Sequence, residues 1–372
     1  MSVPALYSHT TRSTGTTLTA AIYNADHTNH ITNGTPAQLG SYSATSGEMQ
    51  SATDPGAVGA ESLASSLAGE LERLRYFLKN SYGGAQWYSL APAPDFCEGR
   101  LTLTTGVPVT TADVTAAETL YWTPYNGNRV SLYDGTSRWN VRTFSELSID
   151  IPDATNCYDV FVYDNAGTAA LELTAWTNET TRATALTRQN GVLVKTGATT
   201  RRYLGTFYST TAGNGQVEDS YAKRNLWNYY HRVLRPMKVV EGTDTWNYTT
   251  ATWRQANAST ANQVEFVRGV EEDPVKVDVQ GCASNSSVGL SAAVGVGIDA
   301  TNANSATVLS GEQLQVAGQR QSLTARYVGY PGVGRHYAAW VEFSDATGTT
   351  TWLGDGGSST IMQSGIVAEL RG

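Results

Sequence analysis

Charged residues are scarce in this sequence, at 16% of 372 positions against about a quarter in typical globular proteins. The chain has 25 basic and 33 acidic residues, and no basic cluster runs along it, so we expect no nucleic acid partner. No run approaches the roughly 18 consecutive apolar residues of a membrane-spanning helix, and residues 1–13 lack an apolar stretch of signal-peptide length. We therefore expect folding in a reducing cytoplasm and no insertion into a membrane.

Cysteines and catalytic motifs are also scarce. Cys97, Cys157 and Cys282 are widely separated and form no CxxC pair, which gives no support to a disulfide framework or a structural zinc site. The chain contains no P-loop, no GxSxG elbow, no HExxH motif and no dinucleotide-binding fingerprint. The sequence therefore predicts a protein that is not an enzyme and that binds no cofactor and no metal.

What the sequence has in abundance is the composition of short strands and tight turns. It contains 36 Gly, 20 Tyr and 9 Trp residues, and aromatic side chains suit a pleated surface while glycine suits turns. The pairs Asn126-Gly127, Asp134-Gly135 and Asn190-Gly191 separate alternating apolar runs, as in β-hairpins. The strands expected up to residue 217 are 101–104, 119–122, 129–133, 144–151, 159–163, 170–176, 191–195 and 202–208. Those expected after residue 244 are 245–248, 263–269, 275–279, 288–298, 306–309, 313–316, 323–328, 336–343, 349–353 and 361–370.

One long helix is expected before the strands, over residues 54–80. Asp54 suits its N-cap, Pro55 its first position, and Gly83-Gly84 follows its end. The apolar spacing fits a short coiled coil, and a single amphipathic helix packed on its own domain is the alternative. The candidate residues for a trimer interface are the seam Ala64, Leu67, Leu71, Leu74 and Leu78 with the flanking charges Glu70 and Arg75.

The segment of residues 1–53 is too poor in apolar residues to form a core, and we expect an extended arm that gains order against a partner. The spacing of His27 and His30 near Asp26 is compatible with a metal site, but surface or inter-subunit hydrogen bonding is the favoured interpretation. The anchoring candidates in the arm are Ile22, Tyr23, His27, His30 and Ile31.

A second, shorter helix is expected over residues 218–235, ending at Pro236. It would link two β blocks. The predicted fold is mainly β: an arm (1–53), a helical stalk and connector (54–95), a first antiparallel β-sandwich (96–217), a linker helix (218–244) and a C-terminal jelly-roll-like sandwich (245–372). Small residues in 288–298 would let another backbone approach closely, either near a symmetry axis or within the sandwich.

Three weak signals for chemistry have ordinary alternatives. Glu271, Glu272 and Asp273 offer carboxylates for glycoside hydrolysis or simply a solvated turn. The aspartates of 153–164 suit either calcium or turns. His231 has no evident nucleophile nearby in sequence, so we expect a buried, hydrogen-bonded histidine.

Loops that combine aromatic residues with Gly, Asn or Asp are the remaining candidates for recognition. They occur at 122–128, 327–337 and 351–357. Aromatic faces beside short polar groups suit sugar rings as well as protein interfaces, and the interface is the favoured interpretation. The surface-recognition candidates are Trp122, Tyr125, Tyr330, Tyr337 and Trp352.

Four segments carry a resemblance to a known family. TLTAAIYNADHTNHITN (17–33) and DPGAVGAESLASSLAGELERLRYFL (54–78) resemble the N-terminal region of tailed-bacteriophage virion appendage proteins, the fibres and spikes of tail, neck or head. The segment from YDVFVYDNAGTAALEL (158–173) to residue 210, and EDSYAKRNLWNYYHRVLRPM (218–237), look like the central domain of the same proteins.

The resemblance covers roughly residues 14–237 and implies a homotrimeric structural protein of the virion, assembled in the host cytoplasm. Residues 1–53 would bind other virion proteins of the tail, neck or capsid. The β domains would project outward and contact a host-surface glycan or outer-membrane protein. The alternatives are a neck, collar or capsid-decorating protein without receptor binding, and a polysaccharide depolymerase.

Overall fold

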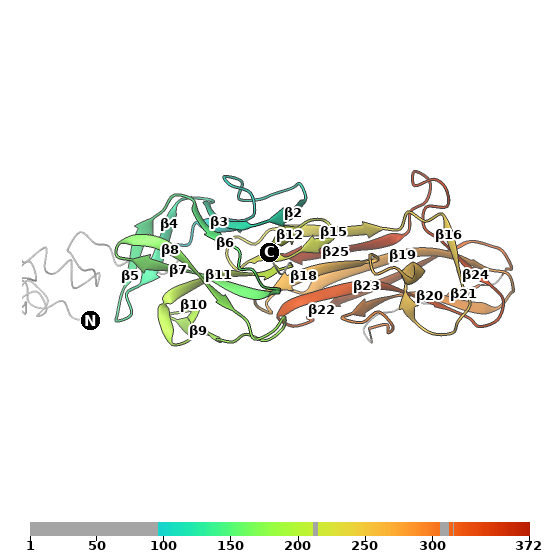
Figure 1. Ribbon diagram of the computed structural model, residues 1–372. Helices are drawn as coiled ribbons and strands as arrows, with labels where there is room; N and C mark the ends of the chain where they lie inside the picture. Colours follow the sequence, from blue (N-terminus) through green and yellow to red (C-terminus); the bar gives the residue numbers. More distant parts are fainter. Residues whose placement is uncertain (1–95, 211–214, 306–311, 315) are drawn as a thin grey trace, which may run out of the picture. The chain divides into compact units, whose positions relative to one another are not determined.

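The computed structural model describes residues 96–210, 215–305, 312–314 and 316–372 (Figure 1). One compact unit consists of residues 96–135 and 141–372, and a second contains Thr136–Asn140. Both hydrophobic clusters of the described core lie in the first unit. The predicted arm and the helix expected over 54–80 lie outside the described residues. Within the described residues the only helical element is the 3-10 turn Ala256–Ala258, and the regular structure is otherwise β-strand, which confirms a mainly β protein.

Three sheets build the N-terminal part of the described chain. One has the strand order β1-β3-β6, the second has the order β8-β7-β11-β10-β9 with β14 beside β11, and the third pairs β4 with β5. The bounds are β1 Gly99–Thr102, β3 Thr119–Pro124, β4 Arg129–Tyr133, β5 Trp139–Thr143, β6 Leu147–Asp150, β7 Asn156–Asn165, β8 Thr168–Ala175, β9 Leu186–Gln189, β10 Val192–Lys195, β11 Ala198–Ser209 and β14 Leu226–Asn228.

Two larger sheets build the C-terminal part. One has the order β2-β12-β13-β18-β23-β20-β21 with β17 beside β23, and the other has the order β15-β25-β19-β24-β16 with β22 beside β19. The bounds of the first are β2 Val114–Ala117, β12 Val217–Asp219, β13 Lys223–Arg224, β17 Arg254–Gln255, β18 Gln263–Arg268, β20 Leu290–Ile298, β21 Glu312–Leu314 and β23 Gly334–Ser344. Those of the second are β15 Leu234–Val240, β16 Thr245–Tyr248, β19 Val275–Asn285, β22 Gln321–Gly329, β24 Thr350–Leu353 and β25 Gly365–Arg371.

The alternation of side chains explains why these residues form strands. Along β19, Val275, Val277 and Val279 are buried while Lys276 and Gln280 are exposed. This period of two places one apolar face of the sheet against the core. Antiparallel pairing prevails, but β13 and β18 run parallel.

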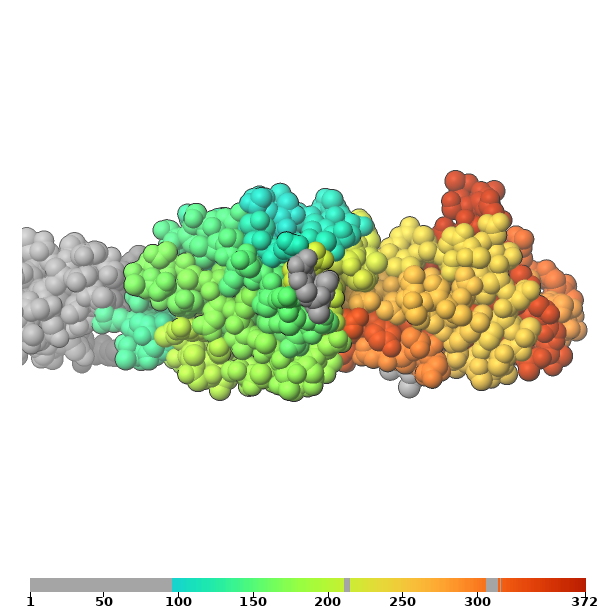
Figure 2. All heavy atoms as spheres, in the orientation of Figure 1, coloured from blue at the N-terminus to red at the C-terminus, as the bar shows by residue number. Residues whose placement is uncertain are grey.

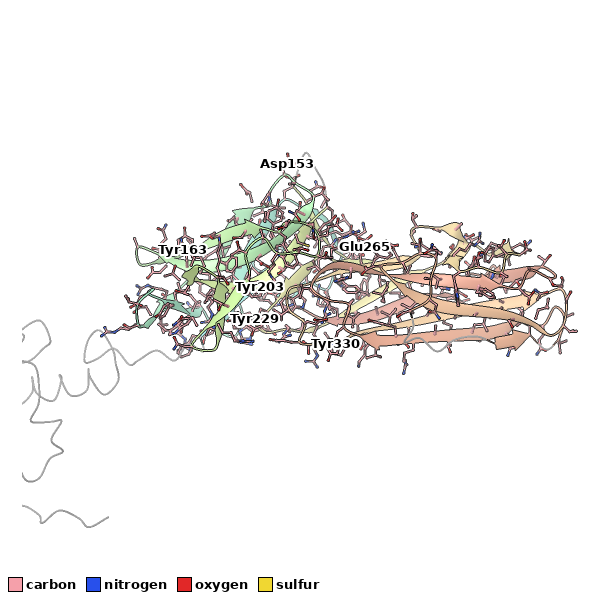
Figure 3. All side chains as sticks on the ribbon, turned by 90° about the horizontal axis from the view of Figure 1, so that it is seen from below. Asp153, Tyr163, Tyr203, Tyr229, Glu265 and Tyr330 are labelled. Atoms are coloured by element: carbon pink, nitrogen blue, oxygen red, sulfur yellow. The ribbon has the colours of Figure 1, made fainter. Side chains whose placement is uncertain are left out.

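One hydrophobic cluster spans both predicted β blocks. Phe161 and Tyr203 from the first block belong to the same cluster as Val264 and Trp340 from the second. Figure 3 shows Tyr203 and Tyr229 close together, and their ring centroids are 5.7 Å apart. The described core therefore continues across the boundary predicted near residues 218–244.

The helix predicted over 218–235 is wrong. Leu226 packs in one hydrophobic cluster and the next residue, Trp227, in the other. Consecutive residues facing opposite cores require an extended backbone, and β14 pairs with β11 through Leu226, Trp227 and Asn228. Helix propensity is a weak preference that tertiary packing overrides. Pro236 lies in β15, the end strand of its sheet.

The hairpin turn predicted at Asn190-Gly191 is confirmed, because both residues have positive φ and β9 pairs with β10 on either side of them. The hairpin predicted at Asn126-Gly127 is wrong: both residues have positive φ, but β3 and β4 on either side of them belong to different sheets. The small residues of β20 also admit a close backbone approach, because a Cβ on Gly297 would lie 2.0 Å from the carbonyl oxygen of Ala300. The approaching backbone comes from the same chain.

Candidate functional site

Two of the predicted surface aromatics are buried, so they are not available for recognition. Trp122 is 1% exposed and stacks on Phe144 with a centroid distance of 3.9 Å. Trp352 is fully buried and donates from its indole nitrogen to Ser344 Oγ. Both tryptophans lie on strands, where packing of a large apolar ring in the core outweighs exposure in a loop.

The three tyrosines predicted for surface recognition are accessible, but they do not form one cluster. Tyr125 packs edge-on against His231. Tyr337 is half-buried on β23, and Tyr330 is 56% exposed, at the outline of the molecule in Figure 3. No contact joins these tyrosines within the described residues.

Several loops expose aliphatic side chains instead. Val288 is 61%, Val316 53% and Ile361 87% exposed. The loop between β24 and β25, which carries Ile361, projects from the surface in Figure 2. Single exposed aliphatic residues are common and define no site by themselves.

The trimer and anchoring candidates of the sequence lie outside the described residues and stay predictions. They are Ala64, Leu67, Glu70, Leu71, Leu74, Arg75 and Leu78 of the seam, and Ile22, Tyr23, His27, His30 and Ile31 of the arm.

The acidic cluster considered for hydrolysis is largely neutralised by arginine. Arg232 donates to Glu272 Oε2 and to Asp273 Oδ2, each at 2.6 Å, and its guanidinium lies 5.5 Å from the ring of Trp227. Arg188 lies 3.5 Å from Glu272. Two carboxylates held by one guanidinium are ordinary surface ion pairs, and this arrangement does not favour a general acid and its partner.

The aspartates considered for calcium have separate roles. Asp159 is buried and pairs with Arg182 at 2.7 Å, whereas Asp164 pairs with Arg142 at 2.7 Å. Within the described residues no three His, Cys, Asp or Glu side chains converge on a metal position. The Nε2 atom of His231 lies 2.8 Å from the carbonyl oxygen of Cys97, so the predicted hydrogen bond is confirmed, whereas the side chain is half-buried and not buried as predicted.

The most extensive candidate for an interaction site is one face of the sheet that contains β15, β25, β19 and β22. We call the exposed side chains of these four strands the outer face. Leu234, Val240, Val328 and Val367 lie on it and are 43–54% exposed. They stand among charged residues, and this combination is typical of protein surfaces that contact something else.

Strand register sets the order of side chains across the outer face. One row runs Lys238, Val367, Asp278 and Arg326, and the row beside it runs Val240, Gly365, Gln280 and Thr324. Arg326 Nε donates to Asp278 Oδ1 at 2.6 Å. The ammonium of Lys238 forms no ion pair within the described part of the chain.

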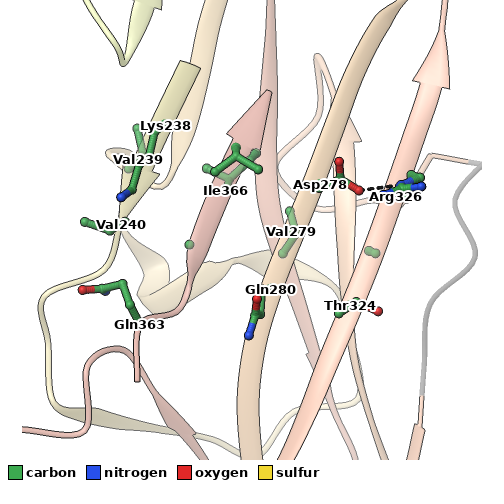
Figure 4. Close-up of a pocket in the computed structure, with 13 residues that line it drawn as sticks. Lys238, Val239, Val240, Asp278, Val279, Gln280, Thr324, Arg326, Gln363 and Ile366 are labelled. Carbon is green, nitrogen blue, oxygen red and sulfur yellow. Dashed lines mark hydrogen bonds and ion pairs between the residues drawn. The ribbon is translucent and has the colours of Figure 1, made fainter. Parts of the chain in front are cut away.

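A hollow of about 530 Å³ opens on this face at Gly365 (Figure 4). Glycine is required there, because a Cβ would lie 2.5 Å from the carbonyl oxygen of Val239. The missing side chain leaves Val240 and Gln280 facing each other across a gap of about two strand spacings, roughly 10 Å. Lys238, Thr324 and Gln363 complete its polar rim.

The sequence alone did not indicate this site. Its residues come from strands spread over more than a hundred positions of the sequence, and each strand alone shows only ordinary alternation of exposed and buried residues. The single local signal was a glycine at the start of a strand, which also occurs in strands without any site.

Comparisons with known proteins identify no family. No protein-family model matches the chain, and no curated protein matches it. Among solved structures, the insecticidal delta-endotoxin Cry8Ea1 of Bacillus thuringiensis is 7% identical with a TM-score of 0.22, covering 74% of this chain and 52% of the toxin.

A Bacillus thuringiensis Cry1Da tryptic core variant is 7% identical with a TM-score of 0.18, covering 69% of this chain and 48% of that one. The structure of the infectious bursal disease virus Gx strain is 11% identical with a TM-score of 0.22, covering 70% and 65%. The chain thus spans about half the length of the two toxins. TM-scores this low carry no argument about function.

Proposed function

We propose that the chain is a homotrimeric structural protein of a tailed-bacteriophage virion, a fibre or spike. Residues 1–53 anchor it to other virion proteins, the predicted helix over 54–80 joins three copies, and the β body contacts the host surface. The finer architecture that belongs to this proposal is a pair of antiparallel β-sandwiches, the second of jelly-roll type. The resemblance of residues 14–237 supports the family.

The structural observation that carries the proposal is that buried ionisable side chains of the β body hold its strands and loops together. Buried Asp219 accepts hydrogen bonds from Arg224 at 3.1 Å and from Arg235 at 2.6 Å. Buried Arg100 donates to the main-chain carbonyls of His231 and Gly372. These groups fasten loops and strands to each other, which is what a rigid structural body requires.

Ionisable residues engaged in this way are not poised for proton transfer. A catalytic group needs a pKa near the working pH and access to a substrate. Burial instead raises the pKa of Cys97 to about 11. The engagement of Asp219 and Arg100 in fastening strands and loops supports the structural role that we propose.

The oligomeric state of the full chain tests the proposal. Light scattering should give three times the chain mass of 39.8 kDa. Leu71→Asp places a charge in the predicted seam and should give monomers or prevent incorporation into virions. Ser66→Asp, outside the seam of the same predicted helix, is the matched control and should remain trimeric.

Two results would contradict the proposal. A monodisperse monomer of the unmodified chain would remove the trimer, and a trimer that survives Leu71→Asp would show that the helix packs on its own domain. Antibody labelling of phage particles by electron microscopy tests the position on the virion. Release of reducing sugar from host envelope polysaccharide, undiminished by replacing Glu271 and Glu272, would indicate an enzyme with another site.

A further inference from the structure

We propose that the hollow at Gly365 binds a carboxylate-bearing saccharide, held by the ammonium of Lys238 and the polar side chains of Gln280, Gln363 and Thr324. This inference names the class of ligand on the host surface. It rests on the proposed function, in which the β body contacts that surface.

The first argument is the set of polar groups without internal partners. Lys238, Gln280 and Thr324 line the hollow from three strands (Figure 4), and their side chains form no hydrogen bond or ion pair within the described residues. Gln363 donates from Nε2 to the carbonyl oxygen of Glu241 at 2.8 Å, which leaves its Oε1 as an acceptor. Amide and hydroxyl groups both donate and accept, as recognition of sugar hydroxyls requires.

The second argument is charge. The whole chain carries a formal net charge of −8, so most of its surface disfavours anions. Lys238 is a cation without a partner in the described part of the chain, whereas Asp278 at the same hollow is already paired with Arg326 at 2.6 Å. A ligand carboxylate beside Lys238 therefore meets an uncompensated positive charge.

The third argument is size. About 530 Å³ falls within the roughly 300–1,000 Å³ of small-ligand sites. Val240 and Val367 provide apolar contacts for the C–H faces of a sugar ring.

The proposal can be tested by titration calorimetry of the full chain with trigalacturonate. The methyl ester of trigalacturonate is the uncharged control. The acid should bind with a dissociation constant in the millimolar range, and the ester about fivefold more weakly, which corresponds to about 1 kcal/mol. Higher salt should weaken the binding of the acid and leave the binding of the ester unchanged. Equal binding of acid and ester, or no binding of the acid, would overturn the proposal.

Variants locate the binding. Lys238→Gln should weaken binding of the acid about fivefold, while Lys276→Gln, the same charge change on the same face but outside the hollow, should leave it within about twofold. Gln280→Tyr fills the hollow from an exposed strand position and should abolish binding. Equal effects of the two lysine changes would overturn the assignment to the hollow.

The oligomeric state separates this proposal from the proposed function. Light scattering of the same variants should show an unchanged assembly. Dissociation by Gln280→Tyr would show that the outer face is a contact between subunits, and would overturn the ligand site while leaving the virion role intact. Loss of saccharide binding with an intact trimer supports the site alone.

Discussion

Glu342 is a residue whose charge should couple folding to pH. Its side chain is fully buried and accepts hydrogen bonds from Arg254 at 2.7 Å and from Trp246 Nε1 at 2.8 Å. Burial raises the pKa of Glu342 from 4.5 to about 7, more than these partners lower it. The protonated carboxyl is therefore favoured in the folded chain over the unfolded one.

The sign of the effect follows from the raised pKa. Stability contributed by protonated Glu342 is fully present below about pH 4.5 and is lost as pH rises through about 7. Glu342→Gln keeps a neutral acceptor for Trp246 and cannot ionise. We expect the stability of wild type relative to this variant to fall by on the order of 3 kcal/mol between pH 4.5 and 8, measured by urea unfolding. A constant difference would contradict the assignment.

The three cysteines should differ in reactivity because their burial differs. All are free thiols, and burial raises the pKa of Cys97 to about 11 and of Cys157 to about 12. Cys282 is half-buried on the outer face. Iodoacetamide at pH 8 should therefore add one group per native chain, detected by mass spectrometry, and none to Cys282→Ser. An adduct on Cys97 would contradict the buried position.

At the scale of elements, the strand β14 predicts that two consecutive residues are both needed for stability, which a helix with one buried face would not predict. Leu226 and Trp227 are both buried but face different clusters, and Trp227 Nε1 donates to the carbonyl oxygen of Arg371 at 2.7 Å. Leu226→Ala and Trp227→Ala should each cost about 2–5 kcal/mol in chemical denaturation. Tyr221→Ala, at a side chain 43% exposed, is the control and should cost less than about 1 kcal/mol. A large loss of stability for only one of the two alanine variants would indicate that this segment buries a single face, as a helix would.

Strands could be predicted wherever alternation and turn chemistry agree. The strands Arg129–Tyr133 and Thr245–Tyr248 have the predicted bounds, and Asn190-Gly191 forms the predicted turn. Residues 218–235 escaped prediction because their aromatic side chains fill two cores at once, which only the tertiary structure determines.

The site was harder to predict than the strands. Aromatic content suggested Trp122 and Trp352 as surface residues, yet large rings are also what cores prefer. The hollow depends on the register that brings Lys238 and Gln280 to either side of β25. Register between distant strands is a property of the folded sheet and has no local pattern in sequence.

At the scale of the whole molecule, a buried ion pair joins the two β blocks. Arg182 donates to Asp159 at 2.7 Å and to the carbonyl oxygen of Gly269 at 2.5 Å, and its guanidinium lies 4.4 Å from the Trp176 ring. Thr206 also donates to Asp159. Because Gly269 follows β18 while Asp159 lies in β7, this arginine holds strands of both blocks to the shared core.

Arg182→Met should therefore destabilise both blocks together. The change leaves Asp159 buried without its cation, and losing one partner of a buried pair costs about 3–5 kcal/mol. Arg188→Met removes a guanidinium that is half-exposed and 3.5 Å from Glu272, so this control should cost less than about 1 kcal/mol. Hydrogen exchange followed by mass spectrometry should show faster exchange in β7, β11, β18 and β23 to the same extent, because one core supports all four strands. Faster exchange confined to β7 and β11 would show that the blocks unfold independently despite the cluster they share.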